Sequence, residues 1–127
     1  MTTPTHHASV RYLVDDVPAA VEFYTGHLGF AVGGHVSPAF AEVFRGQLRL
    51  LLSGPASSGA RATPADVKTP GANRIHLEFD DLAVEVDRLR AAGVSFAGDV
   101  ITGPGGSQIL LTDPAGNLVE LFQPAAR

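Results

Sequence analysis

The sequence predicts an α+β protein made of two similar halves, each with one strand, one helix and about three further strands. Three observations support this prediction. Residues 9–30, SVRYLVDDVPAAVEFYTGHLGF, alternate polar and apolar positions up to an Asp-Asp pair and then change to helical spacing. Residues 74–96, RIHLEFDDLAVEVDRLRAAGVSF, repeat this order. Near the end of each half, GQLRLLLS at 46–53 matches GNLVELFQ at 116–123.

The first half begins with a strand that has two different faces, because side chains alternate across a strand. One face, which should pack under the helix, carries Val10, Tyr12 and Val14. The opposite face, here called the open face, carries Ser9, Arg11 and Leu13. The helix is predicted from apolar residues at helical spacing, Val17, Val21, Tyr24 and Leu28. It should end at Gly29.

The second half has the same polarity. The face of its first strand that should pack under the helix carries Ile75, Leu77 and Phe79, and the open face carries Arg74, His76 and Glu78. The following helix has the apolar stripe Leu82, Val86 and Leu89 and should end at Gly93. The Asp pairs at 15–16 and 80–81 stand where helix caps are expected, so we interpret them as caps and not as catalytic acids.

The repeat aligns the two halves residue by residue. Adding 65 maps Ser9 on Arg74 and Arg11 on His76, whereas adding 70 maps Leu50 on Glu120. We attribute the difference of five residues to loop length. Glu120 is the only acid in its strand, and it should lie on the open face with Leu118 and Phe122. Gln108 and Leu110 should lie beside it on the preceding strand.

The segment between the halves is rich in Gly, Ser, Pro and Ala and has almost no apolar periodicity. We therefore predict one domain with a first module at about 8–53, a linker at about 54–73 and a second module at about 74–124. A connection of this length without regular structure is unusual in a small domain, and such loops are often lids or binding loops.

Composition narrows the class of protein. The 127 residues suffice for one domain, and the formal charge of −4 comes without a run of Lys or Arg, which argues against nucleic acid or an anionic membrane as partners. Cysteine is absent, which excludes disulfides and thiolate chemistry. No signal peptide is evident, and no apolar run approaches the ~18 residues of a membrane helix. We expect a soluble, cytoplasmic protein.

Together these motifs resemble the vicinal oxygen chelate superfamily, which includes glyoxalase I, extradiol dioxygenases, and fosfomycin-resistance and bleomycin-binding proteins. The resemblance runs from about Val10 to Pro124 and is carried by RYLVDDVPAAVEFYTGHLGF, RIHLEFDDL and GPGGSQILLTDPAGNLVELFQP. It implies two βαβββ modules with curved mixed sheets around a shared cavity that binds a small molecule, usually in a homodimer.

In metal-dependent members, the ligands come from the first and the last strand of each module. The resemblance carries these positions over to Ser9, Leu50, Arg74 and Glu120, of which only Glu120 is a usual ligand type. We therefore expect no divalent metal and no other cofactor. A shifted site that uses His76 with Glu120 stays open as an alternative, although Arg74 would oppose a cation there.

Three functions remain open at this point. The first is metal-free binding or sequestration of a small molecule, as in bleomycin-binding proteins, with candidate ligand-binding residues Ser9, Arg11, Leu50, Arg74, Gln108, Leu110 and Phe122. The second is a metal-free lyase or isomerase in which Glu120 or His76 moves a proton. The third is a metal-dependent glyoxalase or dioxygenase. An ion pair between Arg74 and Glu120 with a purely structural role is also possible.

Overall fold

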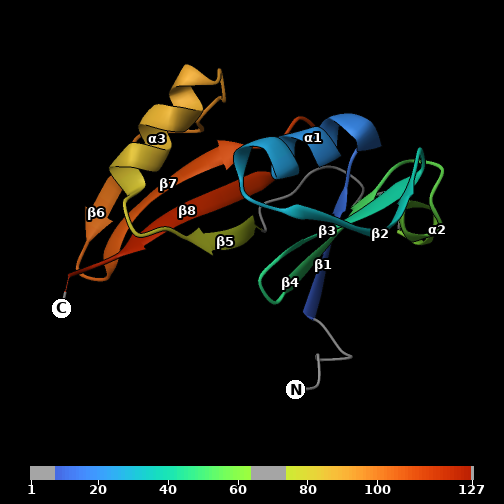
Figure 1. Ribbon diagram of the computed structural model, residues 1–127, viewed down its shortest axis with the longest axis horizontal. Coiled ribbons are helices and arrows are strands. Elements are labelled where there is room, and N and C mark those ends of the chain that lie inside the picture. Colours follow the sequence, from blue (N-terminus) through green and yellow to red (C-terminus); the bar gives the residue numbers. More distant parts are fainter. Residues whose placement is uncertain (1–7, 64–73, 127) are drawn as a thin grey trace. The chain divides into compact units, whose positions relative to one another are not determined.

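The computed structural model describes residues 8–63 and 74–126. It confirms the α+β class with two βαβββ modules. The chain divides into two compact units, Met1–Pro70 and Gly71–Arg127, and each contains one four-stranded sheet (Figure 1). The two units are described separately below.

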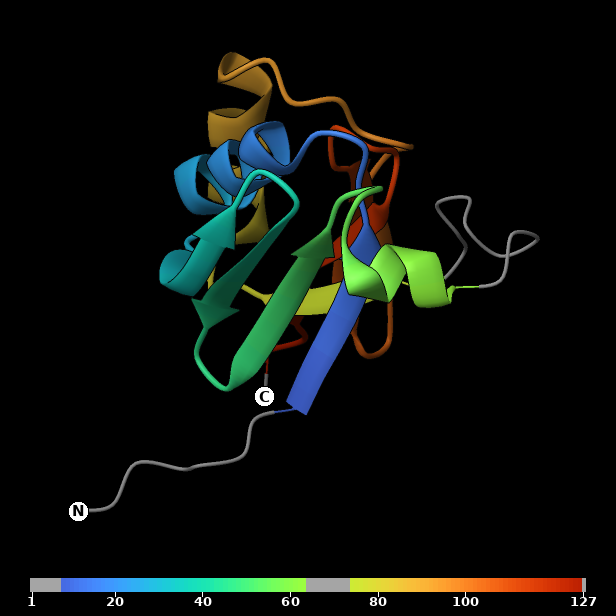
Figure 2. The same ribbon diagram turned by 90° about the vertical axis from the view of Figure 1, so that its right-hand side faces the viewer.

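Unit 1 contains six elements. They are β1 (Ala8–Leu13), α1 (Val17–His27), β2 (Ala31–Ser37), β3 (Phe40–Arg45), β4 (Leu48–Ser53) and α2 (Ser58–Ala62). The strand order is β1-β4-β3-β2, with β1 parallel to β4 and the other neighbours antiparallel. Figure 2 shows β1 and β4 side by side, with α2 next to β1. The two edge strands of this sheet are therefore β1 and β2.

Unit 2 repeats this topology. Its elements are β5 (Arg74–Glu78), α3 (Leu82–Ala91), β6 (Ile101–Gly103), β7 (Gly106–Thr112) and β8 (Leu118–Pro124). The strand order is β5-β8-β7-β6, again with the first strand parallel to the last. Both crossovers run through the helix that follows the first strand, as the internal repeat predicts.

Both long helices begin and end as their sequences predict. Asp16 Oδ1 accepts a hydrogen bond from the Ala19 N–H (3.1 Å), and Asp81 Oδ1 accepts one from the Val84 N–H (3.2 Å). Each Asp satisfies an N–H group that has no partner within its helix. After the helices, Gly29 and Gly93 adopt φ values of +76° and +83°, which favour glycine. The second Asp of each pair, Asp16 and Asp81, is thus confirmed as a cap, whereas no capping bond is seen for Asp15 or Asp80 in the described residues.

Each core lies between a sheet and the helix that covers one of its faces (Figure 1). In unit 1 the buried apolar residues on the helix-facing side of the sheet are Tyr12, Ala41, Val43, Leu50 and Leu52, with Val14 just after β1, and those of α1 include Ala20 and Tyr24. Leu51, on the opposite side of β4, is also buried. In unit 2 they are Ile75, Leu77, Ile109, Leu111, Val119 and Leu121, with Leu82, Val86 and Leu89 of α3. The predicted helix-facing sets of the first strands are confirmed, although Val10 and Phe79 are only half-buried.

The strand registers contradict the prediction that Leu50 corresponds to Glu120. In unit 1 Arg11 lies beside Leu51, whereas in unit 2 His76 lies beside Glu120. Because neighbouring residues of a strand face opposite ways, Leu51 belongs to the open face and Leu50 to the helix-facing side. Leu50 is fully buried there. The run of leucines at 50–52 carries no polar residue that would have fixed the alternation, so a sequence alignment can slip by one position.

The predicted linker at 54–73 is wrong in one respect, because it contains the short helix α2. Ser57 caps this helix: its Oγ accepts from the Ala60 N–H (3.2 Å) and donates to the Gly54 carbonyl (2.7 Å). The buried hydroxyl thus provides a hydrogen-bond partner for one backbone N–H and one backbone carbonyl at the start of the helix. The rest of the linker, residues 64–73, lies outside the described residues.

Within the described ranges, no helix has both the length and the hydropathy that a membrane span requires.

Candidate functional site

The open face of unit 2 is a regular array of side chains from three neighbouring strands. The registers place three rows across β5, β8 and β7: Arg74, Leu118 and Thr112; His76, Glu120 and Leu110; Glu78, Phe122 and Gln108. Glu120 occupies the centre. Six residues singled out from the sequence, Arg74, His76, Gln108, Leu110, Glu120 and Phe122, therefore share this face.

Glu120 is held by two basic side chains. Arg74 Nε donates a hydrogen bond to Glu120 Oε1 (2.9 Å), and His76 Nε2 lies 3.5 Å from Oε2. The side chain of Glu120 is only 10% exposed, compared with 37% for Arg74. A carboxylate with so little access to water is stable only with a close partner, and Arg74 supplies it. The ion pair that the sequence suggested is thus present.

The imidazole of His76 also lies close to an aromatic ring. Its ring lies 4.8 Å from the ring of Phe122, centroid to centroid, at an angle of 41°. Such a contact restricts ring rotation and keeps Nε2 near Glu120. The centre of this face therefore holds one carboxylate, one guanidinium and one imidazole beside an aromatic ring.

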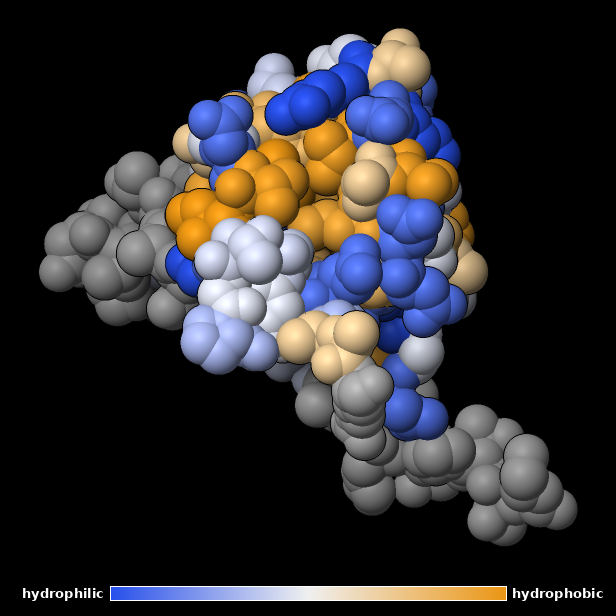
Figure 3. Space-filling view, turned by 90° about the vertical axis from the view of Figure 1, so that its left-hand side faces the viewer, coloured by the Kyte–Doolittle hydropathy of each residue, from blue (hydrophilic) through white to orange (hydrophobic). Residues whose placement is uncertain are grey.

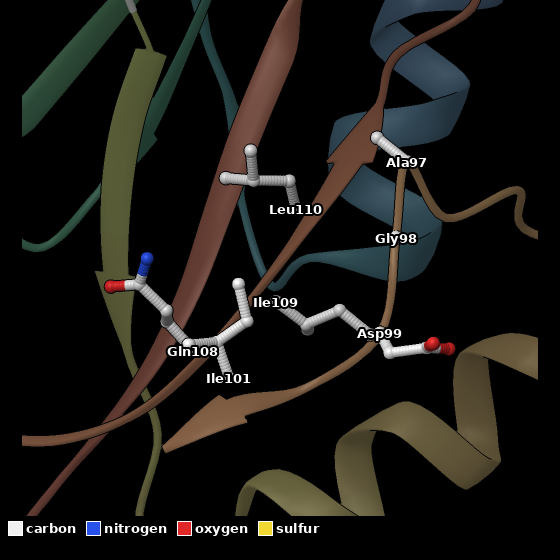
Figure 4. A pocket seen from close by; sticks show the side chains of 7 residues that line it. All are labelled: Ala97, Gly98, Asp99, Ile101, Gln108, Ile109 and Leu110. Carbon is white, nitrogen blue, oxygen red and sulfur yellow. The ribbon is translucent and has the colours of Figure 1, made fainter. Parts of the chain in front are cut away.

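A pocket of about 360 Å³ opens at the edge of the same sheet (Figure 4). It is lined by residues 97–99, by Ile101 and by 108–110. The Ala97 N–H donates to the Leu110 carbonyl (2.8 Å), and regular pairing resumes only at Ile101 with Gln108. The intervening residues 98–100 leave the ladder, so the pocket lies where strand pairing is interrupted.

Exposed apolar side chains lie near this pocket. Figure 3 shows apolar surface on the side of the molecule that carries α3 and β6. In this part of the chain Val100 and Ile101 are 44% and 66% exposed. Gln108 and Leu110 line the pocket and also belong to the open face next to Glu120. Apolar walls with a few fixed polar groups are typical of small-molecule sites.

The open face of unit 1 has the same layout with different chemistry. Its rows across β1, β4 and β3 are Ser9, Arg49 and Phe44; Arg11, Leu51 and Glu42; Leu13, Ser53 and Phe40. Leu51 stands at the centre, where unit 2 has Glu120. Ser9 and Arg11, both predicted for this face, are on it, and Leu50 is not.

Glu42 is the residue of this face that sequence reasoning missed. Its Oε2 accepts from the His35 N–H (3.1 Å), and its Oε1 lies 3.2 Å from Arg49 Nε. Its side chain is 7% exposed. The sequence could have identified Glu42, because it is the single acid in the segment FAEVFR at 40–45, just as Glu120 is the single acid of its strand. Each unit thus holds one buried acid paired with one arginine.

The donors at the metal positions implied by the fold do not fit a divalent cation. Leu50 is buried on the helix-facing side, and Leu51, which takes its place on the open face, has no atom that can bind a metal. The one carboxylate at these positions, that of Glu120, is already bound by Arg74. In residues 8–63 and 74–126, no three His, Cys, Asp or Glu side chains come close enough together to hold an ion. A shifted site would have only His76 and Glu120, fewer than the three protein ligands of most catalytic zinc sites.

Comparisons with known proteins agree with this fold. A sequence model of the Glyoxalase/Bleomycin resistance protein/Dioxygenase superfamily matches residues 6–121. No curated protein matches the chain. Among solved structures, lactoylglutathione lyase from Agrobacterium tumefaciens is 25% identical, with a TM-score of 0.74 and 95% of each chain covered.

Two further structures are similar. An antibiotic-binding protein from a Streptomyces species is 25% identical, with a TM-score of 0.74, and 98% of this chain and 100% of that chain are covered. A superfamily member from Sphaerobacter thermophilus is 23% identical, with a TM-score of 0.71 and coverage of 94% and 98%. The chain therefore belongs to the Glyoxalase/Bleomycin resistance protein/Dioxygenase superfamily.

Proposed function

We propose that this protein binds a small molecule on the open face of unit 2, around Glu120, without a metal ion. The observation that supports it most is the buried carboxylate of Glu120 at the centre of that face, held by Arg74 at 2.9 Å. An acid in this position is not needed for the hydrophobic core, because its strand neighbours Val119 and Leu121, which face the opposite side, are fully buried. A polar ligand group can exchange for one partner of the pair.

The rest of the face suits an apolar ligand body. Leu110, Leu118 and Phe122 surround the polar centre, and the pocket beside Gln108 extends the apolar surface. Similarity to an antibiotic-binding protein supports binding without turnover as the first reading. We infer that the protein binds and sequesters a hydrophobic or cationic ligand, as bleomycin-binding proteins do.

A panel of small molecules screened by thermal shift tests this proposal. A ligand that raises the melting temperature of the wild type, but not of Glu120→Gln, supports it, because binding only to the folded state stabilises that state. Glu85→Gln is the matched control, since Glu85 lies on α3 and pairs with Arg88 away from the open face. Equal responses of wild type and Glu120→Gln to every hit contradict the proposed site.

A second candidate is a metal-free isomerase or lyase. The observation that favours it is the distance of 3.5 Å between His76 Nε2 and Glu120 Oε2. Glu120 would remove a proton from one substrate atom, and a protonated His76 would deliver one to another. Transfer of the abstracted proton from Glu120 to His76 over the 3.5 Å between them would then restore both groups, so an isomerisation needs no further reactant. Arg74 would hold an anionic oxygen. Similarity to lactoylglutathione lyase is compatible with such chemistry.

Product analysis on each hit separates the two candidates. Loss of turnover in Glu120→Gln with ligand binding retained supports the enzyme. A ligand that is recovered unchanged after long incubation supports binding alone. Metal-dependent glyoxalase or dioxygenase activity ranks third, because the residues at the expected metal-ligand positions do not fit a divalent cation. We expect less than about a tenth of an equivalent of any divalent ion in the purified protein and no activity restored by added metal.

We further propose that the protein is a homodimer and acts in the cytoplasm. The family commonly completes its sites in dimers, and both sheets end in strands with exposed apolar residues, Val36 in β2 and Ile101 in β6. A chain without cysteine is compatible with a reducing compartment.

A further inference from the structure

We infer that Arg11 forms an anion-binding point on the open face of unit 1, which takes an organic carboxylate with an apolar body. This inference depends on unit 1 alone and is independent of the function proposed for Glu120. It follows from how the arginines of the open faces are paired, from the fixed position of Arg11 and from its neighbours on the sheet.

The first step is charge compensation. Arg74 is paired with Glu120, and Arg49 lies 3.2 Å from Glu42. Arg11 differs, because its Nη1 donates to a neutral group, the hydroxyl of Ser53 (2.7 Å). In the part of the chain that the structure describes, no ion pair joins Arg11 to a carboxylate. Its charge and most of its N–H donors are therefore available to a ligand.

The second step is position. Ser53 is fully buried, so the acceptor that holds Arg11 Nη1 does not move with the surface. On the other side the guanidinium lies against α2 at Gly59, where a Cβ atom would come within 2.6 Å of Arg11 Cζ. That glycine leaves room for the guanidinium plane. A long side chain that is already ordered loses little entropy on binding, so its hydrogen bonds are worth more.

The third step is the chemistry of the neighbours. Leu51 lies beside Arg11 in the same row but is buried, whereas Leu13, next on the same face of β1, is half-buried. Glu42 ends that row, two strand spacings or roughly 10 Å from Arg11. Its charge is already matched by Arg49. A single carboxylate on Arg11 with an apolar body over Leu13 fits this arrangement, whereas a second negative group would approach Glu42.

The test is an NMR titration of the full chain with sodium acetate, sodium hexanoate and inorganic phosphate. Hexanoate should shift the Arg11 Nε–H signal and the amide signals of Ser53 and Gly59. It should bind about tenfold more tightly than acetate, because each buried methylene adds to affinity. Phosphate should bind no more tightly than acetate. Hexanoate shifts that map only to unit 2, or no preference for hexanoate over acetate, overturn the inference.

Three variants make the test specific. Arg11→Gln should abolish the hexanoate shifts, and Arg11→Lys should weaken binding about tenfold, because a lysine keeps the charge but lacks the planar fork. Gly59→Ala keeps Arg11 but displaces its guanidinium, so it should weaken binding as much as Arg11→Lys, with little change in melting temperature. Gly59 is thus a positioning residue.

The matched control is Arg61→Gln, which removes one exposed positive charge from α2 and should leave the affinity for hexanoate unchanged. An equal loss in Arg61→Gln and Arg11→Gln would show general electrostatic attraction and overturn the inference, as would full binding by Arg11→Gln or Gly59→Ala. Failure here does not affect the ligand screen on Glu120, because the probe, the reporter signals and the variants all concern unit 1.

Discussion

One residue at the centre of each sheet decides the chemistry of its open face. Unit 2 has Glu120 at this position and unit 1 has Leu51, although the two units share their topology. A carboxylate in such a place requires a compensating cation nearby, and Arg74 provides it. A leucine requires none, and within the described residues no ion pair joins the neighbouring Arg11 to an acid.

The Arg74–Glu120 pair should contribute measurably to stability. Arg74→Met leaves Glu120 mostly buried without its main partner, so we expect the free energy of unfolding to fall by about 1–2 kcal/mol. The double variant Arg74→Met with Glu120→Leu should recover most of this loss, because no buried charge remains. Urea denaturation followed by circular dichroism measures both effects.

Arg88→Met is the control for that prediction. Arg88 pairs with Glu85 on the surface of α3, where its side chain is 44% exposed, so its loss should cost no more than about 0.5 kcal/mol. A loss in Arg74→Met no larger than in Arg88→Met would mean that the Arg74 pair is also worth little.

Gly33 is needed for the Glu42 pair in unit 1. A Cβ at Gly33 would come within 2.6 Å of both Glu42 Cγ and Phe44 Cε1, and Glu42 is held in place by the His35 N–H. We expect Gly33→Ala to lower the free energy of unfolding by about 1–3 kcal/mol. Gly34→Ala is the matched control, since its Cβ would meet its nearest atom at 3.9 Å, an ordinary contact. Similar unfolding curves for the two variants would contradict this account.

At the scale of elements, the helices are defined by local chemistry and the strands by their partners. Asp16 and Asp81 cap α1 and α3, and a glycine with positive φ follows each helix. These features depend on residues close in sequence, so they could be predicted. Which residues of β4 face the helix depends on its register with β1 and β3. The sequence does not show this register, and Leu50 was therefore assigned to the wrong face.

The two caps should matter for stability and not for ligand binding. Asp16→Ala and Asp81→Ala should each lower the free energy of unfolding by about 1 kcal/mol, because each leaves a helix N–H without its acceptor. Asp15→Ala and Asp80→Ala are exposed neighbours and should change it by less than about 0.5 kcal/mol. Thermal unfolding compares the four variants, and an equal loss in all of them would contradict a capping role.

At the scale of the whole molecule, the same topology occurs twice, and one edge strand of each sheet exposes apolar side chains. The edge strands β2 and β6 expose Val36 (55%) and Ile101 (66%). Exposed edges with apolar side chains are common sites of association. The expected homodimer is consistent with this surface.

Sedimentation velocity measures the oligomeric state. We expect a species of twice the 13.2 kDa of the chain. Val36→Lys or Ile101→Lys should shift it towards the monomer if that edge forms the interface, because a lysine on an edge strand discourages pairing. Val84→Lys is the control, since Val84 is 57% exposed but lies on α3. A wild-type chain that sediments as a monomer contradicts the dimer.

Much of the candidate site could be predicted because strand alternation is a local property. The open faces of β1, β5 and β8 follow from sequence alone, and the pairing of Arg74 with Glu120 was one of the alternatives that the sequence left open. Glu42 could have been found by the same criterion. The pocket beside Gln108 could not, because it arises where residues 98–100 leave the ladder with β7.

The amino-acid sequence by itself determined the two modules, their helix caps and which side of most strands faces the core, since these depend on spacing along the chain. Only the tertiary structure decided that Leu51 is the counterpart of Glu120, that Glu42 takes Arg49, and that Arg11 is held by Ser53 against Gly59. These contacts join residues far apart in sequence, and their geometry depends on strand register, which is set by packing between elements.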